Sequence, residues 1–282
     1  MLLRVVAPFV ATSLLGGMTA AFVVGRIEAG PQPPPVGRPT VVTFRSESDR
    51  IHVAGSGSCL PIVEHLLDHF EERARVVLHP SIGSRGALRA LERGAIDVGL
   101  VSRRMELPSA GRWRWIGLAR VEVVFAAHPS VQLEAVGVDD LVAFYQGPGR
   151  GMLRGRRALA LLREAGDSGL VAIASALPRL GAALERARAE PDAIVLLTDA
   201  EMRDALLDMP GAVGPLDIGA VRLQAPSLRV LRVRDAPAIH KELAVVLPAR
   251  AHPVADRFVR FLQSERARAL MRGAGYEPWE GP

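Results

Sequence analysis

The sequence predicts an α/β fold built on an open sheet. Three strand-like segments, which begin IHVAG, ARVVL and AIDVG, each run into a polar turn, and two stretches with helical spacing of apolar residues separate them. The composition is that of a globular protein, with 49% hydrophobic and 23% charged residues. The 282 residues are enough to bury the core of one bilobal domain or of two small domains.

The N-terminal residues are expected to direct the chain out of the cytoplasm. An almost uninterrupted apolar run covers residues 5–24, and a helix that spans a bilayer needs about 20 such residues. The apolar core of a cleaved signal peptide is shorter, about 7 to 15 residues, so the length favours a retained anchor, although the small residues at 19–21 leave cleavage open. Residues 1–29 are therefore assigned to a signal or anchor helix. Residues 30–40 follow as a linker, because their prolines cannot continue a helix.

The folded part is expected to start near residues 41–51 and to alternate strands with helices. The first strand runs into the turn GSGS, and residues 60–74 then show helical spacing. The second strand leads to the turn SIGSRG and to a second helix that ends on Gly94. The third strand ends on a Ser-Arg pair. Ligands of open α/β sheets bind at the carboxyl ends of the strands, which is where these three turns lie.

These turns carry the predicted chemistry. A glycine turn that leads into a helix exposes backbone N–H groups and directs the positive end of the helix dipole at an anion. Serine hydroxyls add donors, and an arginine can hold an oxyanion through two parallel hydrogen bonds. A single Gly/Ser turn is most often only a turn. Because such polar turns recur at successive strand ends, at 55–58, 83–86 and 102–103, together they predict a site for a small oxyanion.

The order and spacing of these segments resemble those of the substrate-binding proteins of phosphate ABC transporters. In that family a strand runs into a Gly-Ser turn and a helix that begins with proline. A second Gly/Ser turn then precedes a helix that ends in G-x-x-D-I-G, and a Ser-Arg or Ser-Asp pair follows. The corresponding segments here are AGSGSCLP, IGSRGALRALERGAIDVGL and VSRRM. Further similar segments are VDDLVAFYQG at 138–147, REAGDSG at 163–169, GAVG at 211–214 and the terminal helices with GYEP at 251–278.

The resemblance implies a type II periplasmic-binding-protein-like fold, in which two α/β lobes enclose a cleft and a double crossover forms the hinge. Residues 41–126 with 218–282 would form the first lobe, and residues 127–217 the second. The implied function is capture of a small oxyanion, phosphate first among them, for an ABC transporter permease. The protein would lie in the periplasm, secreted or anchored to the inner membrane, and no cofactor is implied. The alternative is a membrane-anchored sensor or interaction module on the same fold, with altered or lost anion binding.

Carried over position by position, the resemblance implies a ligand set from both lobes: Ser56, Gly57, Ser58, Ser84, Ser102, Arg103, Arg163, Asp167, Ser168 and Gly169. Two departures bear on the anion. Arg103 stands where many phosphate binders have an aspartate, which accepts the proton of monohydrogen phosphate and so excludes sulfate. The chain therefore lacks this means of excluding sulfate unless Asp167 supplies the acceptor. Leu170 replaces a threonine hydroxyl of the family. Arg163 could instead be a solvated helix residue, and Arg104 competes with Arg103 for the position in the cleft.

The sequence lacks the motifs that other classes of function require. No serine lies in a Gly-x-Ser-x-Gly elbow, which argues against an enzyme, and the GSG turn lacks the third glycine of a dinucleotide fingerprint. The net charge of +5 comes almost entirely from arginines interleaved with glutamates, without a nucleic-acid-binding motif, so no nucleic-acid partner is expected. Cys59 is the only cysteine and the histidines lack metal-ligand spacing, so neither an intramolecular disulfide nor a metal site is predicted.

Overall fold

A computed structural model describes residues 49–105, 111–147 and 150–281. These residues belong to one compact unit, which spans residues 42–282. The predicted signal or anchor segment and the predicted proline-rich linker lie outside the described residues. Within the described ranges, no helix is both long enough and apolar enough to cross a bilayer.

One eleven-stranded sheet runs through the described part of this unit. Its strands are β1 (Ile51–Gly55), β2 (Val76–Leu78), β3 (Val98–Val101), β4 (Trp113–Ala127), β5 (Ala135–Gly137), β8 (Leu159–Arg163), β9 (Ile194–Leu196), β10 (Ala212–Asp217), β11 (Arg229–Arg234), β12 (Ile239–Pro248) and β13 (Tyr276–Pro278). The main path has the order β2-β1-β3-β12-β4-β10-β8-β9, and β6 (Met152–Leu153) pairs separately with β7 (Arg156–Arg157). Strand β1 is parallel to β2 and β3, whereas β12 and β4 are antiparallel to their neighbours on this path.

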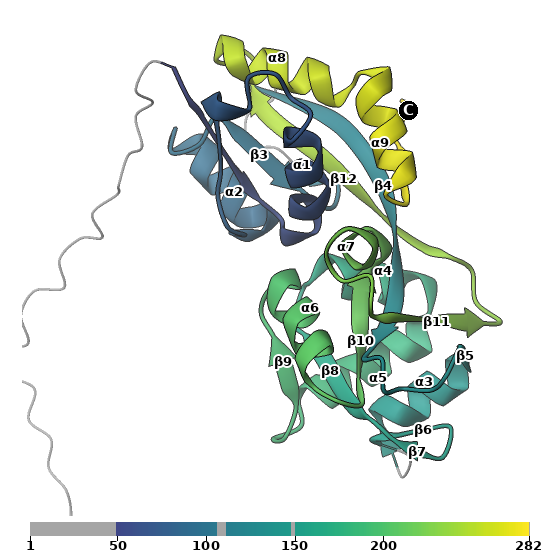
Figure 1. The fold of residues 1–282 in the computed structure, drawn as a ribbon. Helices are drawn as coiled ribbons and strands as arrows, with labels where there is room; N and C mark the ends of the chain where they lie inside the picture. The colour runs from purple at the N-terminus through teal and green to yellow at the C-terminus, as the bar shows by residue number, and fades with distance from the viewer. Residues whose placement is uncertain (1–48, 106–110, 148–149, 282) are drawn as a thin grey trace, which may run out of the picture. The chain divides into compact units, whose positions relative to one another are not determined.

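Helices cover both faces of the sheet in the first lobe (Figure 1). One face packs against α1 (Leu60–Leu67), α8 (Pro253–Leu262) and α9 (Glu265–Gly273). The other face packs against α2 (Gly83–Glu92). Helix α2 begins inside the predicted SIGSRG turn, and Gly94 follows it at a φ of 64°, the left-handed conformation that commonly ends a helix. The strand–turn–helix order of the sequence therefore places the polar turns at the carboxyl ends of β1, β2 and β3.

The second lobe has the same layered construction. Its helices are α3 (Val138–Tyr145), α4 (Ser168–Ala176) and α5 (Pro178–Arg188) on one face, and α6 (Asp199–Asp208) and α7 (Ile218–Gln224) on the other. Strand β4 supplies both cores, because successive side chains of a strand point to opposite faces. Phe125 packs with the first group of helices, and Val124 and Ala126 pack with the second.

Strands β4 and β12 run between the two lobes as a pair of long crossing strands (Figure 1). They pair antiparallel from Val123 opposite Ile239 to Trp113 opposite Pro248, with an irregularity between Leu243 and Ala244. This pair is the double crossover that the resemblance implied.

The point at which the chain returns to the first lobe is a proposal. Helix α7 contributes Ala220 and Val221 to a core of the second lobe, and β11 pairs with β5 and with the end of β4. These contacts join residues 218–234 to the second lobe, whereas the sequence analysis placed the boundary between 217 and 218. We therefore propose that the second lobe extends to about residue 234 and that the chain returns along β12.

The helix that the sequence predicts over residues 60–74 is shorter in the structure, since α1 ends at Leu67. Phe70 packs its ring 5.3 Å from that of Phe258 and 5.4 Å from that of Phe261. Burial of a phenylalanine side chain contributes about 2 kcal/mol to stability. This is more than the difference in helix propensity between ordinary residues, which is below about 1 kcal/mol. Tertiary packing therefore overrides local propensity here.

Gly55 joins β1 to the first polar turn at a position without room for a side chain. A Cβ atom there would lie 2.0 Å from the carbonyl oxygen of Leu100 in β3. We expect Gly55→Ala to lower the free energy of unfolding by about 3 kcal/mol, because backbone atoms of paired strands would have to move apart. Urea denaturation followed by circular dichroism measures this change.

The matched control is Gly273→Ala, because a Cβ at Gly273 would have no heavy atom within 4 Å. This variant should be unchanged or more stable by up to about 1 kcal/mol. Equal unfolding midpoints for the two variants would contradict the packing described for β1 and β3.

Candidate functional site

The predicted site residues meet in a cleft between the two lobes. The cleft has a volume of about 550 Å³. Most of the predicted set lines it: Ser56, Gly57, Ser84, Ser102, Arg103, Arg163, Asp167 and Ser168. The other members lie behind its surface. Ser58 is buried, and the backbone N–H of Gly169 donates to the carboxylate of Asp167.

Serine hydroxyls from both lobes join in one hydrogen-bonded chain. Ser56 Oγ donates to Ser102 Oγ at 2.9 Å, and Ser102 Oγ donates to Ser168 Oγ at 2.9 Å. Ser84 Oγ lies 3.3 Å from Ser102 Oγ and accepts the backbone N–H of Ser102 at 3.1 Å. The fold thus brings together the polar turns of the first lobe, and Ser168 joins them from the second lobe.

Helix α4 begins at this chain of hydroxyls. Its N-cap is Asp167, whose Oδ1 accepts the N–H groups of Gly169 at 2.9 Å and Leu170 at 3.0 Å. Oδ2 accepts from Arg163 Nη2 at 3.2 Å. Burial opposes the charge of Asp167, but Lys241, Arg163 and the two N–H groups outweigh burial, so the pKa of Asp167 lies below its ordinary value. Asp167 therefore serves as a helix cap and ion-pair partner, with both carboxylate oxygens engaged.

Arg163 enters the cleft from the end of β8, not from a helix. Its side chain is 5% exposed, so the solvated-helix interpretation was wrong. Beyond Asp167, the guanidinium lies 3.9 Å from Asp199 Oδ2. Its Nε and Nη1 groups are buried and have no hydrogen-bond partner among the described residues. Because an unsatisfied buried donor is costly, these groups are candidates for binding an acceptor from outside the chain.

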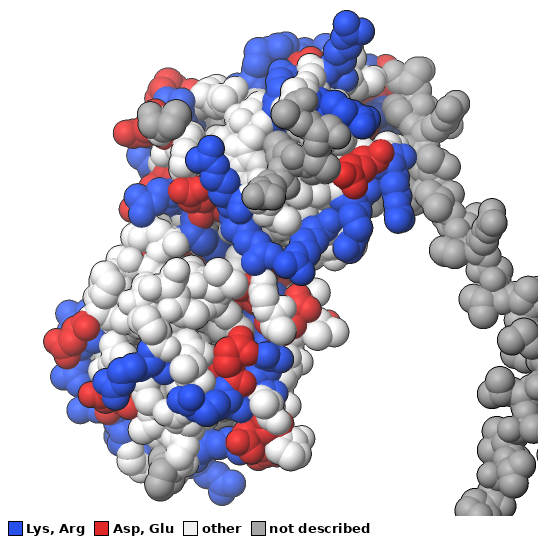
Figure 2. Space-filling model, turned by 180° about the vertical axis from the view of Figure 1, so that it is seen from behind, with Lys and Arg blue, Asp and Glu red and all other residues white. Residues whose placement is uncertain are grey.

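Further arginines lie around the mouth of the cleft. Arg103 lines it together with Arg85 and Arg89, and its Nη1 donates to the carbonyl oxygen of Gly166 across the lobes at 3.3 Å. Arg104 is exposed and is not part of the lining. Basic side chains also gather along the boundary between the lobes on the face seen in Figure 2. Such positive charge attracts anions and raises their rate of encounter.

Lys241 and Asp217 form an ion pair behind the serines. The sequence analysis predicted these serines but not the ion pair. Lys241 Nζ lies 2.9 Å from Asp217 Oδ1, and the two side chains are 5% and 3% exposed. Burial raises the pKa of Asp217 to about 6, although the nearby Lys241 opposes this shift. A signal was present in the sequence, because Lys241 is the only lysine among 35 lysines and arginines. It also lies at a buried position of the segment IHKEL, in which buried and partly exposed residues alternate. A lysine on the buried face of a strand needs a specific partner.

Asp199, the first residue of α6, approaches the first lobe at Gly57. A Cβ atom on Gly57 would lie 2.4 Å from Asp199 Oδ2. Glycine at this predicted position therefore permits the close approach of a carboxylate from the second lobe. The buried cations Arg163 and Lys241 are thus surrounded by three carboxylates, those of Asp167, Asp199 and Asp217.

Cys59 lies beside the first turn as a packed side chain. It is fully buried, and its Sγ donates to the carbonyl oxygen of Val101 at 3.4 Å. Burial raises the pKa of its thiol above the ordinary value, which disfavours the nucleophilic thiolate. Among the described residues, no group of three or more His, Cys, Asp or Glu side chains could hold a metal ion.

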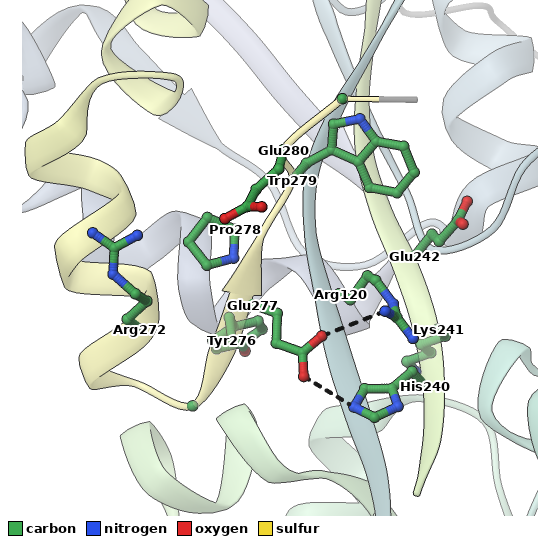
Figure 3. A pocket seen from close by; sticks show the side chains of 12 residues that line it. Arg120, His240, Lys241, Glu242, Arg272, Tyr276, Glu277, Pro278, Trp279 and Glu280 are labelled. Carbon is green, nitrogen blue, oxygen red and sulfur yellow. Dashed lines mark ion pairs between the residues drawn. The ribbon is translucent and has the colours of Figure 1, made fainter.

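A larger cavity, of about 890 Å³, lies against the crossing strands and β13 (Figure 3). Three of its ionisable side chains pair with one another, since Glu277 lies 3.6 Å from Arg120 Nη1 and 3.4 Å from His240 Nε2. Arg120 and Glu277 are about half exposed, and none of the predicted turns reaches this cavity. We therefore take the smaller cleft as the candidate functional site, since two buried donors of Arg163 there have no partner within the described part of the chain.

Comparison with known families indicates what kind of protein carries this cleft. The model of the PBP superfamily domain matches residues 40–215, which is more than half of the 282 residues. The chain belongs to the PBP superfamily. Two α/β lobes joined by crossing strands are the type II form of this superfamily, so the predicted fold is confirmed. No curated protein matches the chain.

Solved structures of PBP type II-like proteins share this fold at low sequence identity. One is described as a phosphate ABC transporter substrate-binding protein from Clostridium perfringens with bound phosphate. It has a TM-score of 0.66 and 15% identity, over 82% of this chain and 100% of that one. An ABC-type phosphate transport receptor from Vibrio cholerae has a TM-score of 0.56 and 18% identity, over 81% and 99%. The regulatory domain of HypT from Salmonella typhimurium also has a TM-score of 0.56 and 18% identity, over 80% and 99%. Transport receptors and a regulatory domain therefore share the architecture.

Proposed function

We propose that this PBP superfamily member binds a small oxyanion in the cleft between its lobes, outside the cytoplasm, and passes it to an ABC transporter permease. Phosphate is the first ligand to consider. The observation that carries the proposal is the buried guanidinium of Arg163, which has two donors without a partner among the described residues and lines the same cleft as the serine hydroxyls. The role is binding without catalysis.

The arrangement suits an anion because the donors come from both lobes. Burial of a charged ligand is costly unless fixed hydrogen bonds replace its hydration shell. Ser56, Ser84 and Ser102 offer hydroxyls from the first lobe, while Arg163 and Ser168 offer donors from the second. An anion held by one lobe alone would keep part of its hydration and gain only part of these bonds. Ligand binding therefore favours the closed state through differential affinity.

The choice of phosphate rests on the resemblance of the anion turns and on the two transport receptors with the same fold. Arg103 remains the main departure. Because both oxygens of Asp167 already accept hydrogen bonds, this carboxylate is poorly placed to accept a hydrogen bond from the proton of monohydrogen phosphate. Sulfate must therefore be compared directly with phosphate.

Isothermal titration calorimetry of the purified protein tests the proposal. We expect phosphate to bind with a Kd of about 1 µM or less, which corresponds to about −8 kcal/mol. Sulfate and molybdate are the comparison anions. If either one binds more tightly than phosphate, that anion is the ligand, and oxyanion capture still stands. Absence of binding heat with all three anions at several temperatures would contradict oxyanion capture.

A sensor or interaction module is the second candidate. The observation that favours it is the set of three carboxylates around the two buried cations, which already neutralises their charge. The HypT regulatory domain has the same fold. Retention of the folded state together with no response to any of the three anions would favour this candidate over transport.

The extracytoplasmic location depends on residues 1–29, which we propose to be a signal or anchor segment, with residues 30–40 as a spacer. A fusion of these 40 residues to alkaline phosphatase measures export, because that enzyme is active only where its disulfides form. Export should give phosphatase activity, and fractionation should place it in the periplasm or on the inner membrane. An inactive, cytoplasmic fusion would contradict the location.

A further inference from the structure

We propose that Lys241 is a positioning residue of the anion site, which holds the hydroxyl of Ser168 as a donor toward the ligand and is itself held by Ser58 and Asp217. This inference rests on the proposed function. Lys241 is not among the residues that line the cleft, so it acts through the serines and not by contact with the anion.

The ammonium group of Lys241 has three hydrogens, and three oxygens of neighbouring side chains lie around it as acceptors. Nζ lies 2.6 Å from Ser58 Oγ, 2.9 Å from Asp217 Oδ1 and 3.3 Å from Ser168 Oγ. Ser58 belongs to the first lobe and Ser168 to the second, and Lys241 itself lies on the crossing strand β12. One side chain therefore joins both halves of the site from the hinge.

These bonds determine what the hydroxyls can do. An ammonium group only donates, whereas a serine hydroxyl has one proton and two lone pairs. Ser168 Oγ accepts from Lys241 and also from Ser102 Oγ, so both of its lone pairs are engaged. Its own proton must then point to another acceptor, and Ser168 lines the cleft. A hydroxyl fixed in this way favours an anion, which offers acceptors in every direction.

The charge of Lys241 is maintained although the group is buried. Burial alone would lower its pKa, but the carboxylates of Asp217, Asp199 and Asp167 outweigh this effect, and the pKa is raised. The ammonium thus remains a donor throughout the physiological range. It also lies beside the larger cavity of Figure 3, on the strand that carries His240 and Glu242.

Lysine is chemically suited to this position in a chain that otherwise uses arginine. The donors of an ammonium group are tetrahedral and can reach three separate oxygens, whereas a guanidinium presents a rigid planar fork. Arginine at this buried position would also need more volume. We therefore expect Lys241→Arg to fail as a conservative replacement.

The test compares phosphate titrations of the full chain and its variants. In Lys241→Met/Asp217→Asn both charges are removed together, which avoids a single unpaired buried charge. We expect this variant to stay folded, with an unfolding midpoint close to that of the wild type, and to lose phosphate affinity at least tenfold. Asp217→Asn alone keeps the ammonium donor and removes a negative charge, so phosphate affinity should rise.

A spectroscopic readout separates positioning from a merely structural role. Because Lys241 is the only lysine, ¹⁵N-lysine labelling gives a single side-chain ammonium signal in NMR spectra. A buried, hydrogen-bonded ammonium exchanges slowly with water, so the signal should be visible at neutral pH. It should shift when phosphate is added and also in Ser168→Ala.

The outcomes distinguish the two proposals. Wild-type affinity for phosphate in the folded double variant, or an ammonium signal that phosphate leaves unchanged, would overturn the positioning role while oxyanion capture stands. If the wild type binds none of the three anions, oxyanion capture fails, and the positioning role fails with it.

Discussion

Replacement of Arg163 by lysine should weaken phosphate binding about 30-fold, a loss of about 2 kcal/mol. The positive charge remains, but lysine lacks the planar set of donors that arginine offers to an oxyanion. In the structure, Arg163 Nη2 donates to Asp167, whereas Nε and Nη1 are buried and have no partner among the described residues. A lysine ammonium could replace the ion pair with Asp167 only by giving up donors to the ligand. Titration calorimetry measures the affinity.

The control is the same substitution at Arg179, whose side chain is 76% exposed and pairs with Asp139 on the surface. Exposed ion pairs contribute about 0 to 1 kcal/mol, and this pair lies away from the cleft, so Arg179→Lys should bind phosphate like the wild type. Solution scattering adds a second measure, since phosphate should compact the wild type more than Arg163→Lys. Equal affinities and equal compaction in both variants would show that Arg163 does not hold the anion.

Asp217 should make the protein less stable as the pH rises from 4 to 7.5. Burial raises the pKa of Asp217 to about 6, above the ordinary value of 3.8. Between these values the folded protein retains a proton that the unfolded chain releases. Protonation therefore favours folding at low pH, and this contribution is lost as the pH rises through about 6. The charged groups that act on the pKa of Asp217 are Lys241, Asp199 and Asp167, and Lys241 stays charged over this range. Cys59 and Tyr276 also interact with Asp217, but burial raises the pKa of both.

The effect is isolated by comparison with Asp217→Asn, which keeps the shape of the side chain and cannot ionise. Relative to the wild type, this variant should gain about 2 kcal/mol of stability between pH 4 and pH 7.5. Urea denaturation at the two pH values measures the change. The exposed Asp192, whose pKa is lowered chiefly by a hydrogen bond from Arg150, provides the contrast, because Asp192→Asn should change in the opposite direction. A pH-independent difference for Asp217→Asn would contradict the raised pKa of Asp217.

The sequence was sufficient to predict the strands and turns of the first lobe, because their signals are local. Apolar runs, Gly/Ser turns and Gly94 identified β1 to β3 and the end of α2, whereas α2 begins earlier than predicted, inside the SIGSRG turn. The segment before Arg163 was harder, since a short apolar run such as ALALLR fits a helix and a strand equally well. Only its pairing with β9 and β10 makes it a strand.

The part of the site that sequence reasoning missed is non-local. Lys241, Asp217 and Asp199 come from β12, β10 and α6, and no motif connects their positions along the chain. Their roles depend on partners far away along the chain: the hydrogen bond from Lys241 to Ser168 spans 73 positions, and that from Lys241 to Ser58 spans 183. Crossing strands produce such contacts because they carry late residues back into the first lobe. The single lysine was the available signal.

We expect an oxyanion to bind between the lobes in contact with the serine chain and Arg163. The most direct measurement is an anomalous difference map from crystals grown with arsenate, a phosphate analogue whose arsenic atom scatters anomalously. We predict an arsenic peak in the cleft, with arsenate oxygens within hydrogen-bond distance of Ser102 Oγ, Ser168 Oγ and the guanidinium of Arg163. An arsenic peak confined to sites outside the cleft, or an empty cleft at saturating arsenate, would contradict the claim.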